Sequence, residues 1–373
     1  MKNSPIKQSN RYVNDLRRIY FSHDQVKQRR MVLLPFTIAA LFLVIAGIYG
    51  SMSLDVASED VVMLVSAAVI GGYMALNIGA NDVANNMGPA VGGKVLTVAA
   101  AVIIAAVCES AGALLAGGDV VKTVAKGIIN PGDGVDIGDF RNLMLSALLA
   151  AALWINLATF MNAPVSTTHS IVGGVMGAGI AGAGFGLVNW TTMSKIAASW
   201  VISPVFGGLV AAGLLFLIKV KILNAQDRNQ AARRWVPVLI GLMSSAFMAY
   251  MAMKGLKKIW KPSVEVIVLY AILSFFITWF ISIPFIKKQA ENLGNRKKQI
   301  NTLFNVPLII GVALLCFAHG ANDVANAVGP LAAIVSTFTD PSVAAKVSIP
   351  LWVMIIGAFG LALGLLLFGP KLI

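Results

Sequence analysis

Long apolar runs alternate with short polar segments along most of the chain. These runs approach or exceed the roughly 20 residues that a helix needs to cross the hydrocarbon core of a membrane. The predicted spans are residues 31–50, 61–78, 95–116, 143–160, 196–218, 236–253, 264–283, 304–318 and 350–368. The pattern predicts an all-α, polytopic membrane protein in which several helices are short or interrupted by glycine.

The composition supports this class. Of the 373 residues, 58% are hydrophobic and only 12% are charged, which is typical of an integral membrane protein and not of a soluble domain. The net charge of +13 comes from basic residues that lie next to apolar segments, without the interleaved aromatic residues of a nucleic-acid surface. Membrane lipid is therefore an expected partner, and nucleic acid is not.

Basic residues before the first span predict the orientation of the chain. They are Lys2, Lys7, Arg11, Arg17, Arg18, Lys27, Arg29 and Arg30. By the positive-inside rule the N-terminus is expected in the cytoplasm, with the protein in the cell membrane. The basic loops 219–234 and 287–298 are expected on the same side, although the basic segment Lys254–Lys261 between them must then lie on the opposite side.

A polar sequence occurs twice inside apolar surroundings. Gly-Ala-Asn-Asp-Val-Ala-Asn stands at 79–85 and again at 320–326. An ionised aspartate in lipid costs several kcal/mol unless it is paired or faces a wet cavity, so such a cluster predicts a functional site. Two copies that lie 241 residues apart predict a pseudo-symmetric transporter whose site lies where its two halves meet.

The two copies divide the chain into parts. We expect a basic cytoplasmic arm at 1–30, an additional transmembrane helix and external loop at 31–60, and a first transport repeat at 61–219. A basic linker with two transmembrane helices is expected at 220–302, and a partial second transport repeat at 303–373. The second copy of a Pro-Val-Ser-Thr-Thr-His segment found at 164–169 would lie beyond Ile373, so the second repeat is predicted to be truncated.

Each copy presents oxygen ligands on one side of a helix. Asn81 and Asn85 are four residues apart and share a face, as do Asp82 and Asn86. The glycine that opens each copy permits a discontinuous helix, whose free carbonyl groups would add ligands for a hard cation such as sodium. The alternative is a polar interface in which the asparagines only hold neighbouring helices together.

The segment 164–169 has the features of the start of a half-helix. Proline suits the first turn of a helix, and Ser166, Thr167 and Thr168 bring hydroxyl groups close to free backbone N–H groups. A helix N-terminus with hydroxyl donors can bind a tetrahedral anion without arginine or lysine. The alternative is ordinary N-capping of a helix.

Three further ionisable residues lie in or beside apolar segments. Glu109 should be paired or face the site. One alternative is a structural ion pair or hydrogen bond, and the other is ligation of an ion. His169 and His319 lack the spacing of metal ligands, so we interpret them as satisfied polar groups near the site, with a proton-linked role as the alternative. Lys122 and Thr123 are expected at the end of a span.

The motifs and their order resemble the inorganic phosphate transporter (PiT) family. The resemblance covers about 61–219 and 303–373 and includes the neighbourhood of Glu109. It implies inverted repeats around a central site and cation-coupled uptake of phosphate. By motif position it implies sodium ligands at Asn81, Asp82, Asn85, Asn322, Asp323 and Asn326, and phosphate contacts at Asp82, Ser166, Thr167, Thr168, Asp323 and Asn326.

Charge considerations favour a coupling cation. Two aspartates and a phosphate place about three to four negative charges in a low-dielectric pocket, and an anion entering a cell climbs about 2.3 kcal/mol per charge per 100 mV. Sodium suits the oxygen ligands, while protons or a metal–phosphate complex stay open, and no organic cofactor is indicated. Sulfate permease, membrane-embedded hydrolase and channel are the competing functions. A homo-oligomer is one option for the assembly.

Overall fold

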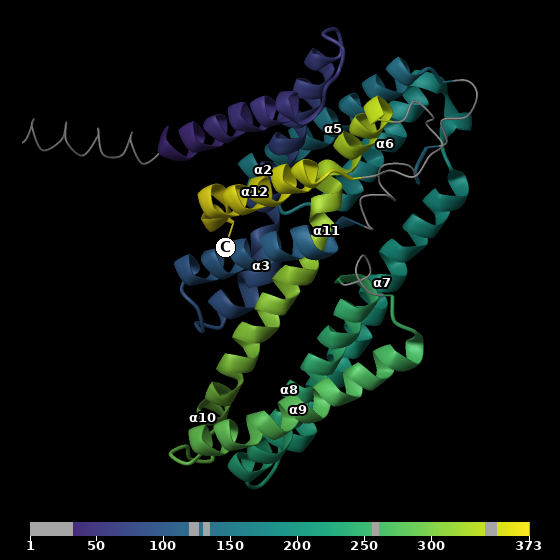
Figure 1. Cartoon of the computed structure of the whole chain (residues 1–373). Coiled ribbons are helices and arrows are strands. Elements are labelled where there is room, and N and C mark those ends of the chain that lie inside the picture. Colours follow the sequence, from purple (N-terminus) through teal and green to yellow (C-terminus); the bar gives the residue numbers. More distant parts are fainter. Residues whose placement is uncertain (1–32, 119–126, 130–134, 256–260, 340–348, 373) are drawn as a thin grey trace, which may run out of the picture.

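The computed structural model describes residues 33–118, 127–129, 135–255, 261–339 and 349–372 (Figure 1). Nearly all of this described part is helical, and it holds no strand. Nine of its helices are long and apolar enough to cross a membrane, and each predicted span overlaps one of them. The prediction of an all-α, polytopic membrane protein is therefore confirmed. Lys122 and Thr123 lie outside the described residues.

Most of the helices are longer than the apolar runs that predict them. In chain order they are the helix Leu33–Ser53, α2 Val61–Gly92, α3 Val98–Ala116, α5 Ile137–Phe160, α6 Thr167–Ala183, α7 Trp190–Ile218, α8 Arg228–Tyr250, α9 Val264–Ala290, the short α10 Lys297–Asn301, α11 Asn305–Thr339 and α12 Leu351–Phe368. The centre is built from α2, α3, α11 and α12, and the pair α5–α6 packs across α2 and α11 (Figure 1).

The expected helix breaks at the two motifs are wrong. Both α2 and α11 continue without interruption through Gly79 and Gly320. The glycines instead permit close helix packing, since a Cβ atom at Gly79 would overlap the carbonyl oxygen of Leu361, and one at Gly320 would overlap the backbone of Glu109. Small residues at helix contacts let backbones approach in this way inside membranes. The discontinuity lies between α5 and α6, at residues 161–166.

The central helices cross in two equivalent pairs. In α2–α12, Gly364 packs on the carbonyl group of Leu76, and in α3–α11, Gly112 packs on that of Phe317. Leu76 and Phe317 are separated by 241 residues, the same offset as the two motifs, while Gly112 and Gly364 are separated by 252. Each crossing therefore joins a motif helix of one half to the following helix of the other half.

An arginine connects three helices at the end opposite to the basic loops. Arg141 in the second turn of α5 donates from Nη1 to Asp60 Oδ1 (2.8 Å), just before α2, and from Nε to Thr337 Oγ1 (2.7 Å) in α11. Its guanidinium group also lies 3.8 Å from the centre of the Phe338 ring. These contacts fix one arm of the α5–α6 pair against both motif helices.

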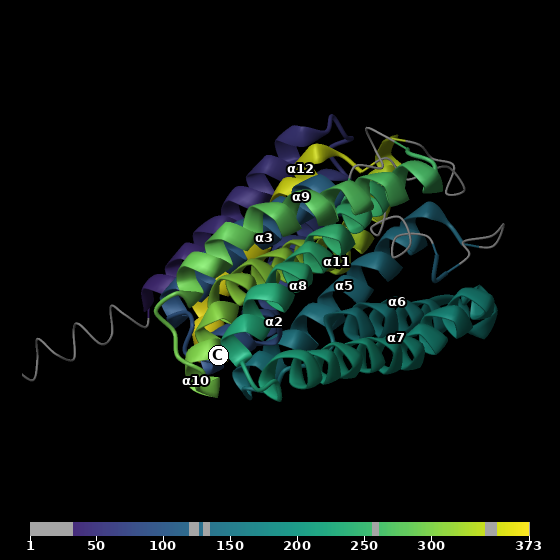
Figure 2. The same cartoon turned by 90° about the horizontal axis from the view of Figure 1, so that it is seen from below.

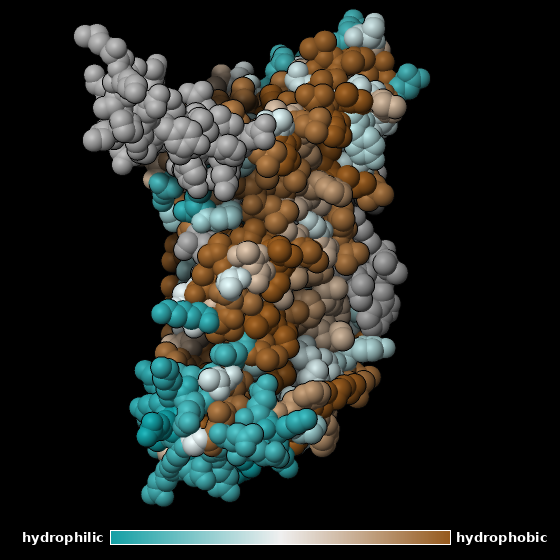
Figure 3. Space-filling view, turned by 90° about the vertical axis from the view of Figure 1, so that its left-hand side faces the viewer, coloured by the Kyte–Doolittle hydropathy of each residue, from teal (hydrophilic) through white to brown (hydrophobic). Residues whose placement is uncertain are grey.

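The two basic loops lie together at one end of the molecule. Arg228 N–H donates to Asn295 Oδ1 (2.6 Å), and the Asn229 side chain donates to the carbonyl oxygens of Ala290 and Leu293. The helices α8 and α9 that end at these loops pack side by side (Figure 2). α7 touches the start of α6 where Trp200 meets His169. Hydrophilic residues gather at the end with the basic loops, below a broad hydrophobic band (Figure 3).

Close packing at the motif glycines has a consequence for stability. Replacing Gly79 by alanine drives a methyl group into the backbone of α12, which we expect to destabilise the folded state by about 1–3 kcal/mol, as overpacking does elsewhere. The measurement is thermal unfolding of the purified protein in detergent. The matched control is Gly207→Ala in α7, where nothing lies within 4 Å of the added atom. Equal unfolding temperatures for the two variants would contradict the packing role.

Candidate functional site

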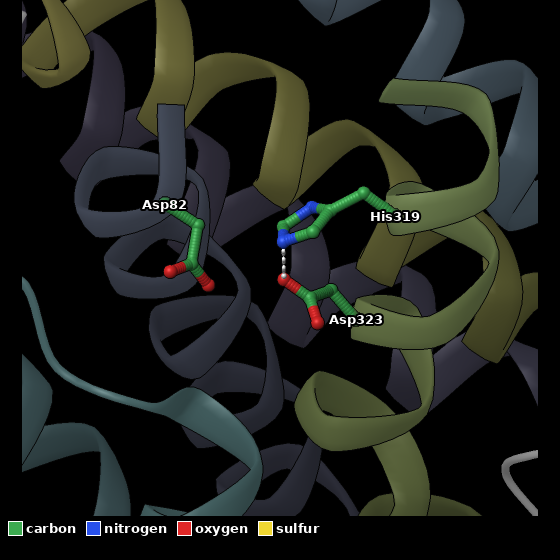
Figure 4. A group of neighbouring side chains, drawn as sticks. All are labelled: Asp82, His319 and Asp323. Carbon is green, nitrogen blue, oxygen red and sulfur yellow. Dashed lines mark ion pairs between the residues drawn. The ribbon is translucent and has the colours of Figure 1, made fainter. Parts of the chain in front are cut away.

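The aspartates of the two motifs meet at the centre of the molecule. Asp82 on α2 is 5% exposed and Asp323 on α11 is 3% exposed. Together with His319 they each offer one ligand atom, and these three atoms lie within 4.8 Å of one another. Figure 4 shows the Asp82 carboxylate facing the other two side chains from the opposite helix. Helices of the two halves thus contribute to one cluster, as the repeated motif predicts.

Asn81 holds the turn between α5 and α6. Its Nδ2 donates to Thr159 Oγ1 (2.9 Å) and to the carbonyl oxygen of Ala163 (3.2 Å), and its Oδ1 accepts from the N–H of Val165 (2.9 Å). The side chain is completely buried. Both amide protons are used, so only one lone pair of Oδ1 is left for an ion. Asn81 is in the first place a tether of the turn at 161–166.

Asn326 holds the start of α6 from the other side. Its Nδ2 donates to Thr168 Oγ1 (2.9 Å) and to Asp323 Oδ1 (3.3 Å), and it lies 3.5 Å from Thr167 Oγ1. Its carbonyl oxygen Oδ1 carries none of these bonds. The N-terminus of α6 is therefore placed between the two motifs, and the hydroxyl groups predicted to contact an anion lie beside Asp323.

The start of α6 differs slightly from the predicted half-helix. The helix begins at Thr167, and Ser166 is its N-cap, with Oγ accepting from the N–H of His169 (3.2 Å). Pro164 lies in the turn before the cap and outside the first helical turn. The first N–H groups of a helix have no carbonyl partner within it, and in α6 the cap satisfies that of His169. N-capping and an anion site are both compatible with this geometry.

Two asparagines of the motifs are on the open side of the cluster. Asn85 is exposed, and its Nδ2 donates to Asp82 Oδ1 (3.1 Å). Asn322 is also exposed, and the structure shows no hydrogen bond from its side chain within the described residues. Their amide oxygens are available to solutes. Of the six predicted sodium ligands, the structure brings Asp82 and Asp323 into one cluster, and Asn85 and Asn326 donate to these two carboxylates.

Glu109 belongs to a buried network beside the aspartates. It is 1% exposed, and its Oε1 accepts from Asn86 Nδ2 (2.8 Å) and lies 3.6 Å from His319 Nδ1. On the other side of the imidazole, His319 Nε2 lies 3.1 Å from Asp323 Oδ2. The hydrogen-bonded alternative for Glu109 is therefore present. The contact between Glu109 and His319 joins α3 to α11 and could not be read from either residue alone.

The two histidines have different surroundings. His169 is exposed and packs edge-on against Trp200 of α7, with ring centres 4.0 Å apart, so it does not belong to the cluster. His319 is at the centre of the cluster. Within the described part of the chain it is the only basic residue that lies within ion-pair distance of Asp323 and Glu109. His319 thus lies in the cluster, but its Nδ1 makes no hydrogen bond, so the expectation of a satisfied polar group is wrong for it. His169 directly follows Thr168 in the first turn of α6.

The pocket combines carboxylate, amide and hydroxyl oxygens with a helix N-terminus. Oxygen ligands of this kind bind hard cations. The N-terminus of α6 attracts an anion through its free N–H groups and the helix dipole. A cation and a tetrahedral anion can therefore be held side by side, each offsetting the charge of the other.

The chain matches proteins of known family. Residues 78–373 match the phosphate transporter family. A Helicobacter pylori protein named as a phosphate permease is 49% identical over 343 residues, which are 91% of this chain and 64% of that protein. A Pyrococcus horikoshii protein, also named as a phosphate permease, is 36% identical over 309 residues, which are 83% of this chain and 75% of that protein.

A solved structure shares the arrangement of helices. It is described as the sodium-dependent phosphate transporter, and it superposes with a TM-score of 0.78 at 36% identity, covering 84% of this chain and 77% of that one. The relatives are longer, since this chain spans 64% of the length of the Helicobacter pylori protein.

The tether at Asn81 leads to a test of the turn. Asn81→Ala removes three hydrogen bonds and leaves the N–H of Val165 without a partner, so the turn at 161–166 should become mobile. Hydrogen exchange read by mass spectrometry should show faster exchange in a peptide covering 161–166. Asn322→Ala is the control, because Asn322 is the counterpart of Asn81 in the motif of α11 and makes no such bonds. Unchanged exchange in Asn81→Ala would show that other contacts hold the turn.

Proposed function

The chain belongs to the phosphate transporter family, and on this premise we propose that it carries inorganic phosphate across the membrane together with sodium ions. The transport mode is secondary and works by alternating access. The observation that supports this function best is that Asp82 and Asp323 converge at the centre of the molecule, where Asn326 links Asp323 to the start of α6. The family favours a transporter over a membrane-embedded hydrolase.

Phosphate is placed at the start of α6 in this proposal. The hydroxyl groups of Ser166, Thr167 and Thr168 and the first N–H groups of the helix donate to its oxygens. A protonated phosphate can in turn donate a hydrogen bond to Asp82 or Asp323, both of which are buried within reach of this helix end. Sulfate at neutral pH has no proton to donate, so it would meet the same carboxylates as an uncompensated anion.

Sodium ions are placed between the anion and the two motif helices. Asp82 and Asp323 supply the charge, and Oδ1 of Asn85 and of Asn326 supply neutral oxygens beside them. Asn322 and the remaining lone pair of Asn81 complete the set. Sodium offsets the carboxylates and the phosphate together, which makes the binding of each solute depend on the other. The sodium-dependent relative supports sodium over protons.

The proposed orientation follows from the basic end of the molecule. We place the protein in a cell membrane. On its cytoplasmic side are the N-terminus, the loops 219–234 and 287–298, and the C-terminal ends of α2 and α12. The turn at 161–166 then reaches the pocket from the external side on a helical hairpin. The two equivalent glycine crossings support transport repeats at 61–219 and 303–373, joined by the linker 220–302.

Removal of either aspartate charge should reduce coupled transport. We expect Asp82→Asn and Asp323→Asn each to lower sodium-dependent phosphate uptake about tenfold or more, because hydrogen bonds and ion contacts of a charged group contribute about 1.5–3 kcal/mol. The measurement is uptake of radiolabelled phosphate into vesicles with an imposed sodium gradient. Asp139→Asn, an exposed carboxylate in the first turn of α5, is the control. Intact uptake in both variants would show that the pocket is not the transport site.

Competition separates phosphate from sulfate. In the same vesicles, excess unlabelled phosphate should suppress the uptake of labelled phosphate, and the same excess of sulfate should leave most of it. The physical reason is the proton that phosphate offers to the buried aspartates. Equal suppression by both anions would favour a sulfate permease of this fold, and sodium-independent uptake would remove sodium as the coupling ion.

A further inference from the structure

The site contains a set of ligands that sodium does not require. Asp82, Asp323 and His319 converge on one point (Figure 4), and we propose that they bind a divalent first-row transition metal ion, of the class from manganese to zinc, in competition with sodium. Sodium prefers oxygen ligands, whereas imidazole is a ligand for zinc, cobalt, nickel and copper. This inference rests on the proposed transport site, with which it shares Asp82 and Asp323, but metal binding can be measured without transport.

The distances suit a single small ion. Three ligand atoms, one from each residue, lie within 4.8 Å of one another, and His319 Nε2 is 3.1 Å from Asp323 Oδ2. Ligands that are about 2.0–2.2 Å from a tetrahedral zinc ion are separated from one another by about 3.3–3.6 Å. A side-chain adjustment of roughly 1 Å, within the reach of rotamer changes, therefore brings all three onto one ion.

Two atoms of this cluster lack the hydrogen bonds that buried polar atoms normally have. Asp323 Oδ2 and His319 Nδ1 are inaccessible to solvent and make no hydrogen bond, although His319 Nε2 is close to Oδ2. His319 Nε2 and Asp323 Oδ2 are 3.1 Å apart but lack the alignment of a hydrogen bond. Buried polar atoms without partners are rare and mark a strained or ligand-binding position. A metal ion between Nε2 and Oδ2 satisfies the carboxylate oxygen.

The surroundings of His319 match the support that metal-binding histidines have. Its Nδ1 faces Glu109 Oε1 at 3.6 Å, and Glu109 is held in turn by Asn86 Nδ2 at 2.8 Å. Metal-bound histidines usually donate their second ring N–H to a carboxylate, which fixes the ring and makes the other nitrogen a better ligand. Glu109 is in the position of that carboxylate, and Nε2 is left to face Asp323 and Asp82.

This support is present in only one half of the molecule. By the offset of the motifs, His319 corresponds to Ile78 and Asn86 corresponds to Ala327. By the offset of the glycine crossings, Glu109 corresponds to Leu361. The Asn-Asp groups proposed for sodium and phosphate occur twice, but the His–Glu–Asn set occurs once. A function shared by both motifs therefore does not explain the His–Glu–Asn set. A ligand that needs a nitrogen donor explains it.

The direct test is metal binding to the purified full chain in detergent, with sodium replaced by choline and without phosphate. Cobalt(II) is titrated and its visible absorption recorded, because this absorption reports ligand type and geometry. We expect one cobalt ion per chain, displaced by zinc and, at higher concentration, by sodium. His319→Gln should weaken binding at least tenfold, and Glu109→Gln about 10–100-fold through the orientation of the ring.

The control is the double variant His23→Gln and His169→Gln, which removes the other two histidines of the chain and should bind cobalt as the unaltered protein does. Thermal unfolding identifies variants that fail to fold. Zinc X-ray absorption on the unaltered protein provides an independent measurement, with one imidazole and oxygen ligands expected.

Two results would overturn the metal site: cobalt affinity that is the same in His319→Gln, or a zinc ion surrounded by oxygen alone. His319 would then be a hydrogen-bonding neighbour of Asp323 and no more. Phosphate uptake is measured separately, so uptake without cobalt binding rejects the metal site alone, and cobalt binding without uptake rejects the proposed transport alone.

Discussion

The carboxylates of Asp82 and Asp323 occupy the centre of a membrane protein, and no lysine or arginine of the described residues forms an ion pair with them. Their mutual repulsion is the constraint to which the surrounding structure responds. In a low-dielectric interior, like charges at this separation are costly unless cations or hydrogen-bond donors offset them. The described residues supply asparagine amides, one histidine and a helix N-terminus. These groups reduce the cost without removing it, so the pocket attracts cations, and a cation in turn makes the pocket suitable for an anion.

The glycine crossings place this charge cluster. Because α2 and α12 touch backbone to backbone at Gly79, and α3 and α11 do so at Gly320, the motif helices are brought close enough for their aspartates to share a pocket. Helices with larger residues at these positions would be held apart by their side chains. The hairpin α5–α6 then completes the pocket through the hydrogen bonds of Asn81 and Asn326 to its turn and to the start of α6.

The sequence predicts the parts of this structure that depend on local pattern. Apolar runs predict the spans, and the repeated Asn-Asp motif predicts that Asp82 and Asp323 are functional and adjacent. The role of Gly79 and Gly320 could not be predicted, because glycine favours both helix breaks and close packing, and only the neighbouring helix decides between them. The tether at Asn81 and the contact between Glu109 and His319 depend on residues about 80 and 210 positions apart. Only the three-dimensional arrangement of helices reveals such contacts.

The central claim is that Asp82 and Asp323 act on the same bound cations. It is tested most directly by a double-mutant cycle on sodium affinity, measured by isothermal titration calorimetry at fixed phosphate concentration with Asp82→Asn, Asp323→Asn and the double variant. Residues that share a ligand show interaction energies of about 0.5–3 kcal/mol, so the double variant should lose clearly less affinity than the sum of the single losses. Losses that add independently, within about 0.5 kcal/mol, would mean that the two aspartates serve separate sites and would contradict the account.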